Sequence, residues 1–328
     1  MTGPSILVVA EFDDAHNAHA AQRCRALERL ECRVDAFDLL GRPGWLGRIG
    51  GKDLPTRLRK AIDAARAEAV LVIGAPALDG QTVQELSAVT GIPWINWFPD
   101  DLRTADVAVE RAPAYQQVFA AGSDVAARLA KAVERPVEVI PLAADPSIYR
   151  PLRSRDQYRA NVVFAGRATP RREAMLAGLA EFGLAVWGPG WRRTSLRDYC
   201  RGEVPDTETY VRAYGGASVA INIHHTAPGR RNAEPEAFLN QRVFEVAAIG
   251  VPQIVDQRAD LDLHFETGKH LLVFDEPEEL RELVKAALHD LPAAEQLGFA
   301  ARKEVLSRHT YMHRMKQLLS GITAGQLH

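Results

Sequence analysis

Residues 6–10, Ile6-Leu-Val-Val-Ala10, are a continuous apolar run near the start of the chain. A helical pattern follows over residues 15–30, and a second strand-like run covers 33–37. A short buried strand followed by an amphipathic helix and another strand is typical of a parallel sheet covered by helices on both faces. This opening stretch therefore predicts an α/β fold of the Rossmann-like type.

The same alternation continues through the first half of the chain. The predicted helices cover residues 54–67, 82–90 and 124–133, and the predicted strands cover 69–73, 93–98, 117–121 and 137–140. Residues 141–155 are rich in Pro, Asp, Ser and Arg and have no regular pattern, which favours a domain boundary. We therefore predict a first domain over residues 1–150.

A second alternation of strands and helices begins after this boundary. The predicted strands cover residues 161–165, 184–187, 218–223, 252–255 and 271–274, and the predicted helices cover 171–182, 207–214 and 238–249, with three helical segments from residue 277 onward. The pattern predicts a second Rossmann-like domain over residues 151–308 and a closing helix over 309–328. The length of 328 residues agrees with two domains.

Composition restricts the class of protein. Lys and Arg total 40 against 42 for Asp and Glu, so binding to nucleic acid or to an acidic membrane is not indicated. The three cysteines form no CxxC pair, which favours reduced thiols without zinc. The apolar runs are too short for a signal peptide or a transmembrane segment. We expect a cytoplasmic protein.

Several common motifs are absent from the sequence. The turn after the first strand, residues 11–16, contains no glycine, so it is not a dinucleotide-binding fingerprint. The chain also has no P-loop, no GxSxG nucleophile elbow and no HExxH pair. We predict no metal site and no cofactor.

A strand-to-helix turn at residues 162–173 has the chemistry of an anion site. Gly166 permits a tight turn, and Thr169-Pro170 is a favourable start for the next helix. The helix amides, together with Arg167, Arg171 and Arg172, can hold a diphosphate. The alternative interpretation is an ordinary turn with solvated arginines.

A second group of polar residues begins at the end of the predicted strand at 218–223 and continues after it. It comprises Asn222, His224, Asn240, Arg242 and Glu245. Polar groups at a strand end and on the first turns of a helix gather at the carboxyl edge of a sheet, where open α/β folds bind ligands. Asn240 can cap its helix. Glu245 lies in an apolar stretch and requires a partner, which is either a pair of ribose hydroxyls or, alternatively, Arg242 in a structural salt bridge.

Two carboxylates and a histidine are candidates for catalysis in the first domain. Asp100 and Asp101 follow a predicted strand, and they either face a cleft or cap the next helix. His16 follows the first strand and is a candidate base or acceptor-binding group. The alternative for His16 is a solvated histidine at a helix start.

Taken together, these segments resemble the spore maturation protein CgeB-like glycosyltransferases, which have the two-domain GT-B architecture. The resembling segments are Trp97-Phe-Pro-Asp-Asp101, Ile140-Pro-Leu-Ala-Ala-Asp145-Pro146, Val163-Phe-Ala-Gly166, Gly188-Pro-Gly-Trp191, Asn222-Ile-His224, Asn240-Gln-Arg242-Val-Phe-Glu245, Gly250-Val-Pro252, residues 271–280 and His309-Thr-Tyr311-Met-His-Arg314. They run in family order over nearly the whole chain. Each segment alone is weak, but the series is fairly specific for the fold.

The resemblance implies two Rossmann-like domains that face a cleft. The second domain would bind a nucleotide diphosphate sugar, with Glu245 at the ribose and Gly166 and the arginines near the diphosphate. The first domain would bind the acceptor, and the closing helix would cross back to pack on that domain. Retaining relatives often carry a second glutamate where this chain has Ala237, with Glu234 and Glu236 nearby. This departure leaves the stereochemical course open.

The implied reaction is sugar transfer to an unidentified acceptor, which can be a polysaccharide, a lipid carrier, a protein or a small molecule. Arginines and helix amides would stabilise the negative charge that grows on the leaving diphosphate. Asp100 or Asp101 would activate the acceptor hydroxyl as a base. Two alternatives remain open: a nucleotide-sugar epimerase or phosphorylase on the same architecture, and a non-catalytic binding protein that has kept the fold.

Overall fold

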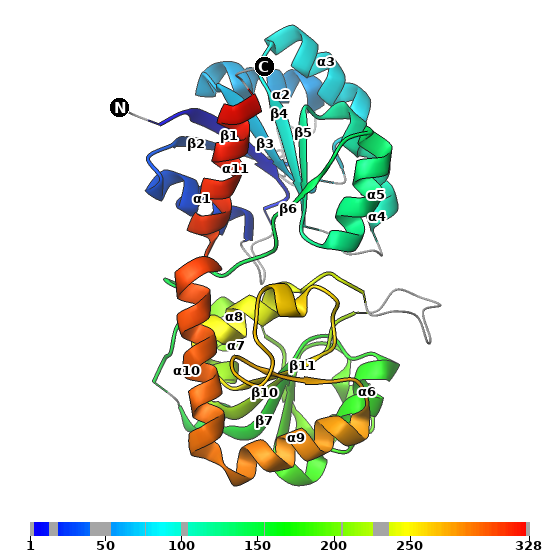
Figure 1. Ribbon diagram of the computed structural model, residues 1–328, viewed down its shortest axis with the longest axis vertical. Coiled ribbons are helices and arrows are strands. Elements are labelled where there is room, and N and C mark those ends of the chain that lie inside the picture. The colour runs from blue at the N-terminus through cyan, green and yellow to red at the C-terminus, as the bar shows by residue number, and fades with distance from the viewer. Residues whose placement is uncertain are drawn as a thin grey trace, which may run out of the picture. The chain divides into compact units, whose positions relative to one another are not determined.

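The computed structural model describes residues 3–12, 19–39, 54–75, 77–99, 104–153, 155–204, 206–225 and 236–325. They form two compact units, each built around one parallel sheet (Figure 1). The first unit holds the described residues of Met1–Pro141 and Tyr311–His328. The second holds those of Leu142–Thr226 and Arg231–Thr310. The chain thus passes into the second unit nine residues before the predicted boundary and leaves it just before the last helix.

The sheet of the first unit has the order β2-β1-β3-β4-β5-β6 among the described residues, and all its strand pairs are parallel. The strands are β1 (Ser5–Ala10), β2 (Arg33–Asp38), β3 (Ala69–Ile73), β4 (Trp94–Phe98), β5 (Gln117–Ala120) and β6 (Glu138–Val139). Every residue of β1, β3 and β4 is buried, because helices cover both faces of the sheet.

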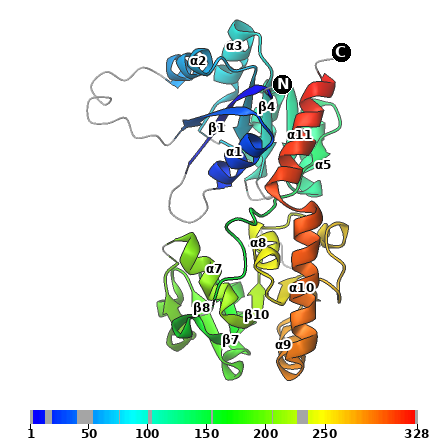
Figure 2. The ribbon, with the colours of Figure 1, turned by 90° about the vertical axis from the view of Figure 1, so that its left-hand side faces the viewer.

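The helices of this unit divide between the two faces. They are α1 (His19–Arg29), α2 (Leu54–Ala65), α3 (Gly80–Thr90), α4 (Ala105–Arg111), α5 (Ser123–Val133) and α11 (Tyr311–Gly325). Helices α2 to α5 share one core with the sheet, while α11 packs beside α1 (Figures 1 and 2). The guanidinium carbon of Arg23 on α1 lies 4.4 Å from the ring centroid of Trp97 and 4.8 Å from that of Tyr311. Within the first unit, this cation–π contact links α11 to α1 and β4.

The second unit has a sheet of the order β12-β11-β10-β7-β8-β9, again with parallel pairs. The strands are β7 (Ala160–Ala165), β8 (Leu184–Trp187), β9 (Cys200–Gly202), β10 (Ala217–Asn222), β11 (Gln253–Asp256) and β12 (Leu272–Phe274). The helices are α6 (Pro170–Ala177), α7 (Thr207–Gly215), α8 (Gln241–Ile249), α9 (Pro277–His289) and α10 (Leu291–Arg308). Helices α6 and α9 share one core with the sheet, and α8 contacts both α7 and α10.

Three elements differ from the sequence-based expectation. Helix α4 and strand β9 were not predicted, because α4 spans only seven residues and β9 is a three-residue edge strand without an apolar run. Helix α6 ends at Ala177, because Gly178 follows and a 3-10 turn replaces the rest of the predicted helix. Among the described helices, none combines the length and the apolar character needed to cross a membrane.

Candidate functional site

The strand order of the second sheet defines where a ligand can bind. Strand β7 lies in the middle, the chain then adds β8 and β9 on one side, and it returns to place β10 on the other side. Open parallel sheets bind ligands outside the carboxyl ends of the strands at such a switch point. The turns that follow β7 and β10 therefore form the centre of the candidate site.

The turn after β7 is fixed by the loop after β8. The amide of Gly166 donates to the carbonyl of Trp187 at 2.9 Å, and the indole of Trp191 donates to the carbonyl of Gly166 at 2.8 Å. Thr169 caps α6, since its hydroxyl accepts a hydrogen bond from the amide of Arg172 at 3.2 Å. The predicted helix start at Thr169 is therefore present in the structure.

Arg172 connects the two turns across the switch point. Its Nε and Nη2 donate to the carbonyl of Ile223 at 3.1 and 2.7 Å, and its Nη1 donates to the carbonyl of Arg167 at 3.0 Å. The side chain is buried. Burial and the neighbouring charge of Arg242 lower the pKa of Arg172 to about 9. Arg172 therefore stabilises the turns and has little capacity left for a ligand.

The other two arginines of this turn differ from each other. Arg171 donates from Nη1 to the carbonyl of His224 at 3.2 Å and lies 3.1 Å from Oδ2 of Asp256. Arg167 is exposed, and its guanidinium makes no hydrogen bond or ion pair with any described residue. The turn thus offers one uncompensated guanidinium and one that is held by a carboxylate.

His224, after β10, forms a buried pair with Asp256 at the end of β11. The ring Nδ1 lies 2.6 Å from Oδ1 of Asp256, and the backbone amide of His224 donates to the same oxygen at 2.9 Å. Burial lowers the pKa of His224 to about 4. The ionised carboxylate can only accept, so Nδ1 carries the proton and Nε2 has a free lone pair. That Nε2 is buried and has no partner among the described residues.

Asp256 extends this pair into a charged network. Its Oδ2 lies 3.2 Å from Nη2 of Arg258, whose Nη1 lies 3.3 Å from Oε2 of Glu236. Burial opposes ionisation of Asp256, but His224, Arg258 and Arg171 hold the pKa of this carboxyl below its usual value. Sequence reasoning missed Asp256. The available signal was its position directly after the predicted strand at residues 252–255.

The amides of Asn222 and Asn240 pair with each other in both directions, at 3.1 and 3.0 Å. Asn222 also donates to Oε1 of Gln253 at 3.2 Å, and Arg242 lies at the limit of hydrogen bonding, 3.5 Å from Oδ1 of Asn222. Asn240 caps α8 by accepting from the amide of Val243. The structure therefore brings three of the predicted site residues, Asn222, Asn240 and Arg242, into one contact group.

Glu245 is deeply enclosed, with 2% of its surface exposed. Its Oε2 accepts a hydrogen bond from the phenol of Tyr210 at 2.8 Å. Burial raises the pKa of this carboxyl. Among the described residues Glu245 forms no ion pair, so the alternative of a salt bridge to Arg242 is not observed. Tyr210 was not anticipated from the sequence, because a tyrosine in a helix is usually a packing residue.

The three catalytic candidates of the first domain, His16, Asp100 and Asp101, lie outside the described residues. The same holds for Glu234, whereas Ala237 is buried. Within the described part of the chain, no three His, Cys, Asp or Glu side chains are grouped as a metal site. The absence of metal from the reaction and the roles of the individual residues stay predictions.

A family model of known proteins matches part of this chain. Residues 171–320 match the family model described as "Glycosyl transferase-like". A search of curated proteins gives no match.

Several solved structures share the fold over nearly the whole chain. HepE of Anabaena, crystallised with UDP-glucose, has a TM-score of 0.68 at 13% identity and covers 97% of this chain and 99% of its own. Sucrose-phosphate synthase of Thermosynechococcus elongatus has a TM-score of 0.66 at 15% identity, with the same coverage. A glycosyltransferase of Rickettsia africae has a TM-score of 0.69 at 12% identity and covers 99% of both chains.

These similarities confirm the predicted fold class, with two parallel α/β sheets as in proteins of the GT-B fold. At this level of identity the solved structures establish the fold alone, and the family model applies to residues 171–320. The family match to residues 171–320, on a chain with this fold, supports a glycosyltransferase enzyme.

Proposed function

We propose that this chain transfers a sugar from a nucleotide diphosphate sugar to an acceptor, without a metal ion or a cofactor, in the cytoplasm. Among glycosyltransferases, we propose that it belongs with the CgeB-like proteins. The observation that carries the proposal is the group of polar side chains at the carboxyl edge of the second sheet. Asn222 and Asp256 end β10 and β11, and the turns after β7 and β10 supply Gly166, Arg167 and His224.

The chemistry of this edge suits a nucleotide diphosphate sugar. The exposed guanidinium of Arg167 is available to phosphate oxygens, whereas the amide of Gly166 already donates to the carbonyl of Trp187 and shapes the turn. Arg171 remains half exposed while Asp256 holds it, so it adds positive charge at a fixed place. Positive charge held in position stabilises the leaving diphosphate more in the transition state than in the ground state.

In this proposal Glu245 contacts the ribose. Tyr210 holds Oε2, and Tyr149 also favours the ionised carboxyl, but Oε1 has no hydrogen bond of normal geometry among the described residues. A ribose hydroxyl donating to Oε1 would satisfy this oxygen, which otherwise carries a desolvation penalty. HepE was crystallised with UDP and with UDP-glucose, so uridine diphosphate sugars are the first donors to test.

The test is a thermal-shift screen of the full chain against UDP, GDP, ADP and their sugars, followed by product analysis. A ligand that binds only the native state increases the free energy of unfolding, by about 2.7 kcal/mol when its concentration is 100 times its dissociation constant. The melting temperature rises as a result. We expect a shift with at least one diphosphate nucleotide, and release of nucleotide when an acceptor is supplied. No shift with any of them would refute the proposal.

Product analysis also separates the alternatives. An epimerase converts the nucleotide sugar without an acceptor, and a phosphorylase consumes or forms a sugar phosphate. A binding protein would show the thermal shift and no product with any acceptor. Transfer of the sugar to a polysaccharide, lipid carrier, protein or small molecule would support the proposal and identify the acceptor class.

A further inference from the structure

A pocket of about 390 Å³ opens beside the turn after β7. The turns after β7 and β8 line it, together with β9 and the residue that follows β9. They contribute the side chains of Arg167, Arg192, Arg193 and Glu203. The pocket therefore lies at the same sheet edge as the proposed donor site, on the β8 side of the switch point.

The charge in this pocket is not balanced. The pocket lining contains three guanidinium groups and one carboxylate. None of the three arginine side chains forms a hydrogen bond or an ion pair within the described residues. Arginines that converge on one concavity create a positive potential that attracts anions. Arg171 and Arg172, by contrast, are already bonded to Asp256 and to backbone carbonyls.

The backbone that carries two of these arginines is held in place. Arg192 and Arg193 follow Trp191, which is fully buried and donates its indole hydrogen bond to Gly166. Gly188, with φ of +116°, has no room for a side chain, because a Cβ atom would lie 2.7 Å from the carbonyl oxygen of Gly166. The loop after β8 is thus packed against the turn after β7, and the three arginines keep a common location.

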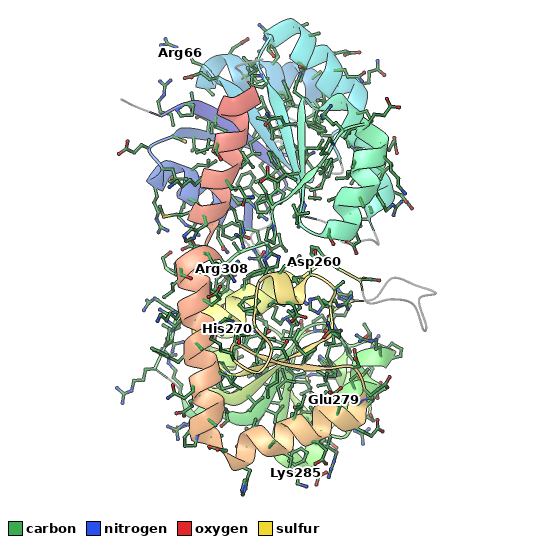
Figure 3. All side chains as sticks on the ribbon, in the orientation of Figure 1. Arg66, Asp260, His270, Glu279, Lys285 and Arg308 are labelled. Carbon is green, nitrogen blue, oxygen red and sulfur yellow. The ribbon has the colours of Figure 1, made fainter. Side chains whose placement is uncertain are left out.

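A different pocket of the same unit provides a contrast. It measures about 450 Å³ and is lined by His270 and Arg308 among others (Figure 3). Its cations have partners: Arg308 pairs with Glu304, and Lys269 lies 2.7 Å from Glu266. Uncompensated positive charge therefore distinguishes the pocket at Arg167, Arg192 and Arg193.

We propose that this pocket binds phosphoryl oxygens, and that Arg192 and Arg193 act with Arg167 to hold the diphosphate of the donor. The planar guanidinium matches two phosphate oxygens at once, which gives both strength and orientation. The identity of the ligand as a donor rests on the proposed function. The assignment adds two arginines of the loop after β8 to the phosphate contact proposed for Arg167.

The experiment compares binding of UDP, uridine and inorganic pyrophosphate to the full-length wild-type chain and to two double variants, Arg192→Ala with Arg193→Ala and Arg192→Gln with Arg193→Gln. Calorimetry measures UDP and pyrophosphate, and ligand-observed NMR measures uridine. The control is Arg197→Ala, since Arg197 is exposed on the same segment and does not line the pocket. All the altered side chains are exposed, so we expect every variant to fold.

We expect both double variants to bind UDP and pyrophosphate about 100-fold more weakly, or roughly tenfold for each arginine lost. Uridine binding and the Arg197→Ala control should stay at the wild-type level. UDP affinity within twofold of wild type in the double variants would overturn the inference. An equal loss for uridine would also overturn it, because the arginines would then contact the nucleoside.

The result also separates this inference from the proposed function. If the wild type binds pyrophosphate through Arg192 and Arg193 but binds no nucleotide, the anion pocket stands and the donor proposal fails. If the wild type binds UDP and transfers sugar while the double variants behave as wild type, the proposed function stands and the inference fails.

Discussion

The carboxylate of Asp256 accepts hydrogen bonds from both the ring Nδ1 and the backbone amide of His224, at 2.6 and 2.9 Å. The two residues are 32 positions apart in the chain: Asp256 ends β11, and His224 lies in the turn after the neighbouring parallel strand β10. This pair fixes the tautomer of the histidine and holds the turn after β10 against β11. Its energetics lead to two predictions.

The first prediction concerns the dependence of stability on pH. Burial lowers the pKa of His224 to about 4, while an unfolded histidine titrates near 6.5. Between these values the unfolded chain binds one more proton, so the free energy of unfolding falls as the pH drops. We expect the protonation of His224 to change the free energy of unfolding by about 1.4 kcal/mol per pH unit between these two pKa values.

Urea unfolding of wild type and His224→Gln between pH 7 and pH 4.5 tests this slope. In the variant, the free energy of unfolding should depend less on pH, because glutamine does not take up a proton in this range. His289→Gln is the control, since His289 is exposed at the end of α9 and should leave the slope unchanged. Identical slopes for wild type and His224→Gln would contradict the buried neutral histidine.

The second prediction concerns the charged network around Asp256. Replacing Asp256 with asparagine leaves Arg258 and Arg171 without their shared carboxylate in a buried setting. Breaking a buried pair by removing one partner typically costs about 3–5 kcal/mol. We expect the free energy of unfolding to fall by about 3 kcal/mol, measured by urea unfolding. Asp198→Asn should change it little, because Asp198 forms only an exposed pair with Arg197.

The third prediction separates binding from stability at Glu245. Glutamine keeps an oxygen for the phenol of Tyr210 and removes a buried charge whose pKa is raised by desolvation. We therefore expect Glu245→Gln to keep or raise the melting temperature while weakening UDP binding about tenfold. Glu282→Gln, on an exposed face of α9, is the control. A lower melting temperature with unchanged UDP affinity would make Glu245 a purely structural residue.

The fourth prediction concerns Asp100 and Asp101 as candidate bases. Asparagine in either position cannot take a proton from the acceptor hydroxyl, so turnover should fall by about 100-fold or more while UDP affinity is retained. The matched control is Asp106→Asn, an exposed residue of α4. Steady-state rates and calorimetry give the two readouts. Wild-type turnover in both variants would remove these residues from the mechanism.

The fifth prediction tests the close contact between the loops after β7 and β8. Alanine at position 188 places a methyl group against the backbone of Gly166 and also requires a positive φ. We expect Gly188→Ala to lower the free energy of unfolding by about 2 kcal/mol or more. Gly178→Ala is the control, because its backbone is right-handed and the nearest atom to a new Cβ, in Arg281, is 3.8 Å away. Equal stability of the two variants would refute the contact.

Much of the fold could be read from the pattern of apolar residues. Strands β3 and β8 match the predicted ranges, because a parallel strand buried on both faces is a continuous apolar run between helices. Strand β9 escaped detection, because it lies at the sheet edge and is made of Cys200, Arg201 and Gly202. Edge strands depend on pairing with a neighbour, and a single sequence does not display that pairing.

The candidate site was predictable only in part. Asn222, His224, Asn240, Arg242 and Glu245 could be named because polar residues interrupt apolar strands and helices at their ends. The partners of these residues could not be named. Asp256 and Tyr210 come from segments far along the chain, and each meets its partner only after the sheet has formed.

The sequence by itself determined the alternation of strands and helices, the fold class and the segments that end at the ligand-binding edge. The tertiary structure alone decided which arginines are available for a ligand. Arg171 pairs with Asp256, and Arg172 donates to carbonyls of the turns after β7 and β10. Within the described part of the chain, Arg167, Arg192 and Arg193 line one pocket and their guanidinium groups have no partner. The physical reason is that hydrophobic periodicity is local along the chain, while charge compensation depends on contacts between distant segments.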